Sequence, residues 1–274
     1  MAKQNKIKVK IKDAKAFLKN ASTEHIKTVL QAAELKKSGE AQKKFLSFVK
    51  KVWPGFIEGT HHRIIAEKME QIASGKLKRL IVNMPPRHTK SEFASYLFPS
   101  WIIGQFPTKK LIQTTHTSEL SVNFGRKMKK LIDSDEFKKV FPKVSIAADS
   151  KASGRWHTNH GGEYFAAGVG GAITGRGADL LIIDDPHSEQ DALSATALES
   201  VYEWYTSGPR QRLQPGGAIV VVMTRWSVKD LTGLLLKAQS DKNADKWEII
   251  EFPAIWESGK AMWPEYWKVE ELEK

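Results

Sequence analysis

The chain has 274 residues, no cysteine and a formal net charge of +12 at pH 7. This length fits one large α/β domain, alone or with an appendage, and the lack of thiols excludes disulfides and thiolate metal sites. No apolar run approaches the roughly 20 residues that span a bilayer, no secretory signal is expected, and the positive charge favours nucleic acid as a partner, with a basic solvated surface as the alternative.

Residues 1–38 are rich in lysine and poor in large apolar side chains, which predicts a basic N-terminal arm or a loosely docked helical segment. Beyond residue 38, apolar residues at helical spacing predict two helices, and short apolar runs then alternate with helical stretches. The helices are expected at 40–53, 61–75, 90–103, 118–134, 197–208 and from Lys229, and the strands at 79–84, 110–116, 178–185, 217–224 and 247–252. Residues 154–177 are rich in glycine and predict a hairpin followed by a loop. Near-continuous apolar strands separated by helices predict a mostly parallel central sheet with helices on both faces.

The first of these strands leads through MPPRHTKS, residues 84–91, into a helix that starts with Lys90 and Ser91. A strand, a turn and a helix N-terminus in this order hold phosphate oxygens with backbone N–H groups. Lys90 would neutralise the β and γ phosphates of a nucleotide, and Ser91 would offer its hydroxyl to Mg²⁺. In the pattern G-x-x-x-x-G-K-S/T, however, Met84 and Thr89 occupy both glycine positions. A proline-rich turn with a helix cap explains this stretch equally well.

A second motif, LLIIDDP, brings Asp184 and Asp185 to the end of an apolar strand, where ligands collect in open α/β sheets. In a P-loop enzyme the first acid orders Mg²⁺ and the second polarises the attacking water, so Asp184 and Asp185 take these roles in turn. A single Asp before Pro186 would more simply cap the next helix. Two adjacent acids after four apolar residues favour the metal site.

Three further residues are candidates for work on the γ-phosphate. Thr224 ends the apolar strand GAIVVVMT and would sense the phosphate or the water, or would simply cap the next helix. Arg87 lies inside the phosphate loop, and Arg176 lies between glycines just before the acidic strand. A guanidinium stabilises the charge that develops in phosphoryl transfer. Arg176 is therefore our candidate for an arginine finger that acts on a neighbouring subunit, with a surface or DNA contact as the alternative for either arginine.

The motifs together resemble the ATPase domain of the large terminase subunit of tailed bacteriophages, the motor that packages DNA. The similar blocks follow one another in the same order; they are VNMPPRHTKS, THTSELSVNFGRKMKKLI, ITGRGADLLIIDDP, VVMTRWSVKDLTG and AMWPEYW. The resemblance implies a P-loop NTPase fold of the additional-strand (RecA-like) type after an N-terminal helical region. It implies domain limits at 39–258, with 259–274 as the start of a linker. A nuclease domain, which complete large terminases carry, is not expected in this chain.

The resemblance also implies ligands and partners. ATP and Mg²⁺ would be the cofactors, with Pro86, Arg87, His88 and Thr89 contributing to the phosphate loop. Base and ribose contacts in this family come from the segment before the loop, which makes Trp53, Phe56, His61 and His62 candidates by position, although helix packing is the simpler role for them. Double-stranded DNA, a homo-oligomeric ring on the capsid portal and the small terminase subunit are the implied partners. No membrane is involved, and the implied location is the cytoplasm of the infected bacterium, transiently at the portal vertex of the procapsid.

Two positions depart from the family pattern. Thr89 stands where relatives carry glycine, and Asp185 stands where many carry glutamate. Lys127, Lys129 and Lys130 could grip DNA phosphates or simply form a solvated helix face. Two other functions stay open: a different P-loop DNA translocase or helicase, and an adaptor for DNA or the portal that binds nucleotide without hydrolysing it.

Overall fold

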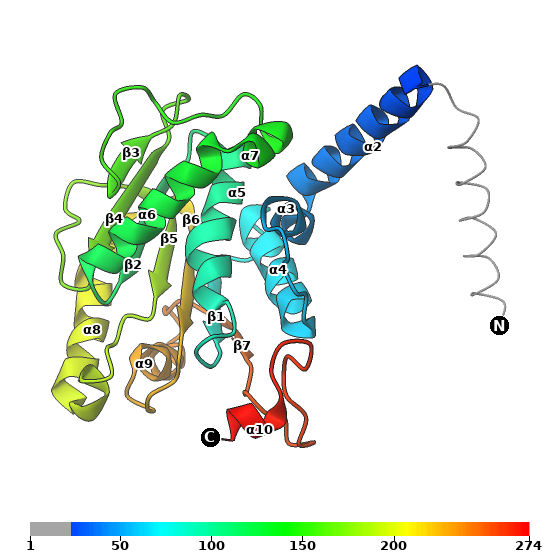
Figure 1. Ribbon diagram of the computed structural model, residues 1–274. Helices are drawn as coiled ribbons and strands as arrows, with labels where there is room; N and C mark the ends of the chain where they lie inside the picture. Colours follow the sequence, from blue (N-terminus) through cyan, green and yellow to red (C-terminus); the bar gives the residue numbers. More distant parts are fainter. Residues whose placement is uncertain (1–22, 274) are drawn as a thin grey trace.

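The computed structural model describes residues 23–273 as a mixed α/β fold (Figure 1). The helices are α2 Thr23–Lys43, α3 Phe45–Val52, α4 Thr60–Ala73, α5 Phe98–Gln105, α6 Ser118–Asp133, α7 Asp135–Val140, α8 Ala195–Ser207, α9 Leu231–Ala238 and α10 Val269–Leu272. The strands are β1 Arg79–Asn83, β2 Lys110–Thr115, β3 Arg155–His157, β4 Glu163–Gly168, β5 Ala178–Asp184, β6 Leu213–Met223 and β7 Glu248–Glu251. A π-helical segment, η1 Glu92–Leu97, precedes α5, and two 3₁₀ turns, η2 Asp191–Leu193 and η3 Pro209–Arg212, flank α8.

The strands form one seven-stranded sheet in the order β3-β4-β2-β5-β6-β1-β7. Neighbouring strands run parallel except β3, which is antiparallel to β4. The expected mostly parallel sheet is thus confirmed, and the expected hairpin is β3–β4 at its edge. Strand β6 lies between β1 and β5, so the strand before the phosphate-loop candidate and the acidic strand are separated by the strand that ends near Thr224.

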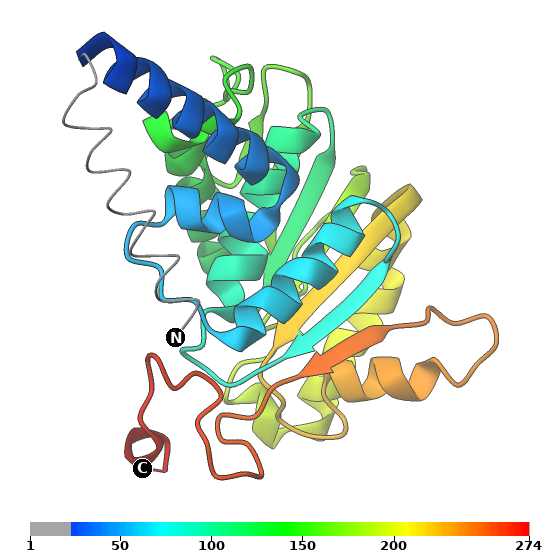
Figure 2. The ribbon, with the colours of Figure 1, turned by 90° about the vertical axis from the view of Figure 1, so that its right-hand side faces the viewer.

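Helices cover both faces of the sheet because its central strands are apolar on both sides. On β5, Leu180 and Ile182 belong to the core formed with α3, α4, α5, α6 and α7. The alternate residues, Leu181 and Ile183, belong to a second core with α8 and α9. Figure 2 shows the strands side by side, with α9 on the other side of the sheet from α3 and α4.

The ends of several elements differ from the sequence prediction. The helix expected at 40–53 is divided, since α2 ends at Lys43 and α3 begins at Phe45. Helix α7 was not predicted; it begins because the Ser134 hydroxyl accepts the Phe137 N–H as an N-cap. The helix expected from Lys90 does begin there, but it continues through the π-helical η1.

The expected domain limits lie near the two ends of the described chain. The limit after residue 38 falls inside α2, which projects from the body of the domain in Figure 1; residues 1–22 of the expected arm lie outside the described residues. In the segment expected to begin a linker, Met262 and Trp263 are buried. The Trp263 ring packs edge-on against His61 of α4, at a centroid distance of 5.3 Å.

Candidate functional site

The carboxyl ends of β1, β6 and β5 bring three of the sequence motifs together. These strands are parallel neighbours, and Asn83 of β1 is level with Met223 of β6, just as Asp184 of β5 is level with Val222 of β6. The loop after β1, Thr224 after β6, and Asp184 and Asp185 on β5 therefore meet at one edge of the sheet. This is the edge where ligands bind in open α/β folds.

Lys90 connects all three strand ends. Its side chain is only 8% exposed, and Nζ lies 2.8 Å from Asp185 Oδ2 and 3.2 Å from Thr224 Oγ1. The Thr224 N–H donates to the other Asp185 oxygen at 2.9 Å. Asp185 has a left-handed backbone, with φ of 41°, and its side chain remains 34% exposed. The site thus holds a buried cation against an acid that still reaches solvent.

Asp184 is the most buried acid of the cluster, at 2% exposure. Its Oδ1 accepts the Ser91 hydroxyl at 3.0 Å, and its Oδ2 accepts the Ser95 hydroxyl at 2.7 Å. Burial, and then the negative charge of Asp185, raise the pKa of Asp184 to about 7, against the two hydroxyl bonds and Lys90, which lower it. Sequence reasoning missed Ser95, although its place four residues after Ser91 was a signal that both face one side of the helix.

The loop between β1 and the helix has an unusual backbone. Arg87 and Thr89 both have left-handed conformations, with φ of 63° and 68°. Within the described part of the chain, no acceptor takes a hydrogen bond from the backbone N–H groups of His88, Thr89 or Lys90. His88 is buried, and its Nδ1 donates to the Pro86 carbonyl at 2.7 Å. Burial, and to a smaller extent the positive charge of Lys90, lower the pKa of His88, against the hydrogen bond to the Pro86 carbonyl, which raises it.

A cavity of about 460 Å³ opens at this edge of the sheet. It is lined by four predicted residues, Pro86, Lys90, Asp185 and Thr224. His116, His187 and Trp226 also line it and were not predicted. Each of them follows closely on a strand end, the same signal that identified Thr224. Arg87 is exposed beside this cavity and does not line it.

A second cavity of about 800 Å³ lies on the other side of the phosphate-loop candidate, between the start of α4 and the C-terminal segment. Of the four predicted base contacts, only His61 lines it. Trp53, Phe56 and His62 instead pack together, with centroid distances of 5.3 Å for Trp53–Phe56 and 4.8 Å for Phe56–His62. The unpredicted lining residues include Phe252, Trp256 and Trp267. The Trp267 ring lies 6.0 Å from that of His88, which places the cavity next to the loop.

Arg176 is not brought to this site in its own chain. It forms an ion pair with Glu163 at 2.8 Å and lies 3.8 Å above the Phe165 ring. Glu163 is the first residue of β4 and is level with Lys110, the first residue of β2. Arg176 therefore lies at the amino edge of the sheet, opposite Lys90, and its assignment as a finger for a neighbouring subunit stays a prediction.

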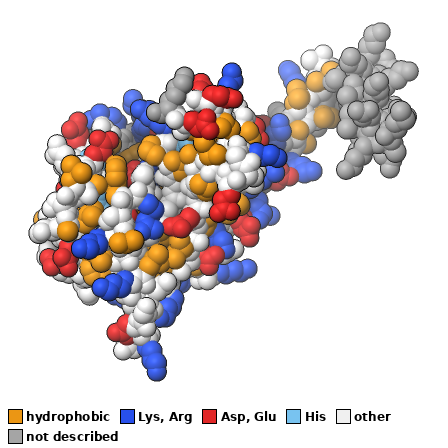
Figure 3. Space-filling view, turned by 90° about the horizontal axis from the view of Figure 1, so that it is seen from below, with side chains coloured by type: hydrophobic (Ala, Val, Ile, Leu, Met, Phe, Trp, Pro, Cys, Tyr) orange, Lys and Arg blue, Asp and Glu red, His pale blue; other side chains and the backbone are white. Residues whose placement is uncertain are grey.

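Two of the three lysines proposed for DNA contact have partners within the chain. Lys127 pairs with Glu92 at 2.9 Å, and Lys129 Nζ donates to the carbonyl oxygens of Ser150, Lys151 and Ala152. Lys130 is exposed. On the face seen in Figure 3, Lys and Arg side chains are scattered among acidic and hydrophobic ones and form no continuous basic surface.

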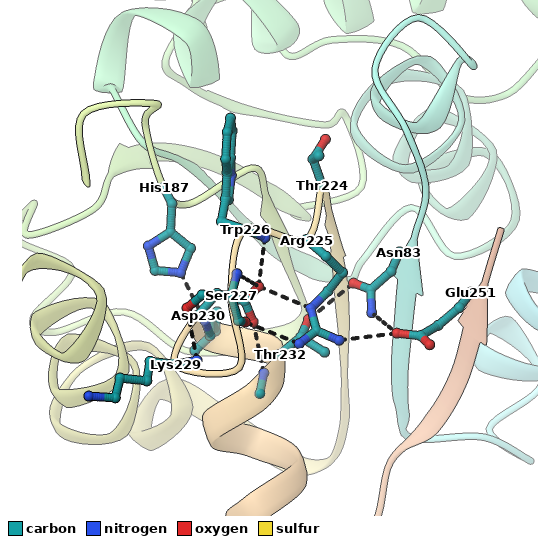
Figure 4. A network of polar contacts seen from close by, with 12 residues as sticks. Asn83, His187, Thr224, Arg225, Trp226, Ser227, Lys229, Asp230, Thr232 and Glu251 are labelled. Carbon is teal, nitrogen blue, oxygen red and sulfur yellow. Dashed lines mark hydrogen bonds and ion pairs between the residues drawn. The ribbon is translucent and has the colours of Figure 1, made fainter. Parts of the chain in front are cut away.

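The segment after Thr224 is held by a polar network (Figure 4). Asp230 is fully buried, and its Oδ2 accepts from the Arg225 guanidinium and from the Trp226 and Ser227 N–H groups. Arg225 also pairs with Glu251 of β7 at 3.2 Å. Glu251 in turn accepts from Asn83, the last residue of β1, at 2.9 Å. The network thus links the residue after Thr224 to the strand that leads into the phosphate-loop candidate.

Comparisons with known proteins give distant likenesses among solved structures. No family model matches the chain, and no curated protein matches it. Among solved structures, the fold is similar to that of the large terminase of bacteriophage HK97, with 14% sequence identity and a TM-score of 0.42. The similar region covers 69% of this chain and 38% of the terminase chain. None of the helices in residues 23–273 has the length and apolarity that a membrane crossing requires.

Proposed function

We propose that this chain is a Mg²⁺-dependent ATPase and the motor domain of a terminase that moves double-stranded DNA into a viral capsid. One observation carries the ATPase proposal: Lys90, Asp185 and Thr224 meet at the carboxyl ends of three parallel strands, beside the N-terminus of a helix. The placement of β6 between β1 and β5 supports the additional-strand P-loop type that the resemblance implies. The DNA-packaging proposal depends on the series of sequence blocks, and on no contact in the structure.

The loop and Lys90 would hold the phosphates. Helix N-termini and free backbone N–H groups attract anions, and the N–H groups of His88, Thr89 and Lys90 are free of acceptors within the described chain. Lys90 is the buried cation at the same place. A γ-phosphate in the 460 Å³ cavity would replace Asp185 as the ion-pair partner of Lys90. Arg87 would contact the same phosphate from the exposed side of the loop.

Asp184 and Ser91 would hold Mg²⁺. Mg²⁺ prefers oxygen ligands, usually one or two carboxylates together with phosphates and water, and the oxygens of Asp184 and Ser91 already lie 3.0 Å apart. Mg²⁺ would supply charge neutralisation of the phosphates. Asp185, released from Lys90, would orient the attacking water, and Thr224, which bonds both Lys90 and Asp185, would register the loss of the phosphate.

The 800 Å³ cavity would hold the base. His61 and Trp267 line it with apolar neighbours, which suits a flat heteroaromatic ring. Double-stranded DNA, a ring of identical subunits, the portal and the small terminase subunit are the proposed partners, in the cytoplasm of the infected host. Arg176 would serve a neighbouring subunit only after leaving Glu163, with which it now pairs.

The test is Mg²⁺-dependent ATP hydrolysis over a range of protein concentrations, with and without double-stranded DNA. Lys90→Ala and Asp185→Ala should each lower the rate by at least about 100-fold, as expected for groups that act on the transferring phosphate. Lys76→Ala is the matched control, because Lys76 is an exposed lysine near the amino end of β1 and its loss should leave the rate unchanged. Equal hydrolysis in all four proteins would refute the proposal, and Mg²⁺–ATP binding without hydrolysis would identify a nucleotide-binding adaptor.

The same assay tests Arg176. A finger in trans requires assembly, so the rate per subunit should rise with protein concentration and Arg176→Ala should abolish that rise. A flat rate per subunit, together with full activity of Arg176→Ala, would leave Arg176 with only its contacts to Glu163 and Phe165.

A further inference from the structure

Thr89 occupies a backbone conformation that favours glycine. Its φ of 68° is in the left-handed region, where a β-branched residue is strained. The residue lies directly before Lys90, so the direction of its peptide groups decides where the loop presents its N–H donors. Something outside the loop has to hold Thr89 in this conformation.

The His62 side chain contacts Thr89 from α4. His62 Nε2 lies 2.7 Å from Thr89 Oγ1, and the Gly59 N–H donates to His62 Nδ1 at 2.8 Å. Because Nδ1 accepts, it carries no proton. Burial lowers the pKa of His62 to about 2, so the ring is neutral and its single proton is on Nε2. His62 therefore donates to the Thr89 hydroxyl, whose own proton is left to donate to the His88 carbonyl at 2.5 Å.

These bonds fix a peptide group of the loop. A trans peptide is planar, so its N–H points opposite to its carbonyl oxygen. With the His88 carbonyl held by the Thr89 hydroxyl, the Thr89 N–H is turned to the opposite side, and no described residue accepts it. The His62 ring cannot swing away, because it stacks on Phe93 of η1 at a centroid distance of 4.8 Å and meets Trp263 edge-on at 5.0 Å.

We infer that His62 is a positioning residue, which replaces the conformational freedom of the missing glycine by holding Thr89 in its left-handed conformation through a relay from Gly59 to the His88 carbonyl. This positioning role differs from the base-contact role expected for His62, since both ring nitrogens already have hydrogen-bond partners within the chain. The consequence for nucleotide binding rests on the proposed function, whereas the relay itself does not.

The test is a double-mutant cycle between His62→Asn and Thr89→Gly. Asparagine keeps an acceptor near the position of Nδ1 for Gly59 but is too short to reach Thr89. His62→Asn should therefore weaken binding of Mg²⁺–AMP-PNP about tenfold, the equivalent of one lost hydrogen bond. In the Thr89→Gly background the same change should weaken binding less than about twofold, because glycine adopts a positive φ without support.

Two comparisons separate positioning from packing. His62→Gln, whose amide nitrogen replaces Nε2, should recover most of the affinity. Met69→Leu is the control, because Met69 is equally buried and lies on the same helix about two turns from His62; its effect should be the same whether Thr89 is retained or replaced by glycine. An equal loss from His62→Asn in both backgrounds, or no loss with Thr89, would overturn the inference.

Unfolding by urea without nucleotide measures the same cycle independently of any ligand. The effect of His62→Asn on the midpoint should be smaller in the Thr89→Gly background than with Thr89. If no protein, wild type included, bound Mg²⁺–AMP-PNP, the proposed function would fail. The difference between the effects of His62→Asn on the urea midpoint with Thr89 and in the Thr89→Gly background would still test whether His62 holds Thr89. Additive effects on the midpoint would overturn the relay whatever the nucleotide does.

Discussion

Asp184 makes the stability of the nucleotide-free protein depend on pH in an unusual direction. Burial and Asp185 raise the pKa of its carboxyl from 3.8 to about 7. Between these values the folded protein keeps a proton that the unfolded chain has lost, so this group lowers stability as pH rises through the window. The pKa of Asp184 rises by about three units, and at ~1.4 kcal/mol per unit this changes the free energy of unfolding by at most ~4 kcal/mol over the full titration. Of this change, ~3 kcal/mol falls between pH 5 and 8.

Asp184→Asn removes this titration while keeping the shape of the side chain. Urea unfolding of both proteins at pH 5, 6, 7 and 8 should show the wild type losing ~3 kcal/mol relative to the variant across the series. Buried histidines whose pKa is lowered, such as His61 and His62, change stability in the opposite direction in acid, but they are present in both proteins and cancel in the difference. Parallel curves for the two proteins would refute the reasoning, as would a wild type that gains stability with pH relative to the variant.

Three further predictions concern the site and its support. Ser95→Ala removes a hydroxyl that lowers the pKa of Asp184, so the Mg²⁺ concentration needed for half-maximal ATP hydrolysis should rise about tenfold at pH 7 and recover at about pH 8.5; an equal loss at both pH values would contradict this. Trp267→Ala should weaken ATP binding about tenfold or more, as expected for loss of stacking on a base, and leave binding of inorganic tripolyphosphate unchanged. Gly125→Ala should destabilise the fold by about 1–3 kcal/mol in urea unfolding, because its Cβ would lie 2.2 Å from the Ser153 carbonyl oxygen, whereas Gly39→Ala in the open part of α2 should stabilise it by about 0.5–1 kcal/mol.

The sheet was predictable because its signals are local. Strands such as β5 are apolar on both faces, and runs of this kind between helices are typical of parallel sheets. Since the carboxyl ends of parallel strands meet at one edge, the meeting of Lys90, Ser91, Asp184, Asp185 and Thr224 followed from the motifs alone. The break between α2 and α3 at Lys44 has neither a proline nor a glycine to mark it, and no side chain caps α3.

The rest of the site depends on contacts between distant parts of the chain. Trp267 comes to the loop through the segment after β7, far from His88 in sequence. Arg176 is drawn to the amino edge by Glu163, a pairing that a glycine-rich loop of unknown path does not reveal. The positive φ of Thr89 has no signal in the residue itself, because threonine does not favour it; the signal was that the phosphate-loop pattern has glycine at this position.

In the ligand-free protein, the Asp185 carboxylate occupies Lys90 and would compete with any anionic ligand for this lysine. Lys90 is too buried to be left without a counter-charge, so a ligand enters only by exchanging its own negative charge for that of the carboxylate. Binding affinity is then a difference between two salt bridges, one of which is already formed at 2.8 Å. In the proposed function, a triphosphate, with several charges, would replace the carboxylate more readily than a monophosphate, and an uncharged nucleoside would not replace it. The pocket would therefore select its ligand by charge before any contact with the base is made.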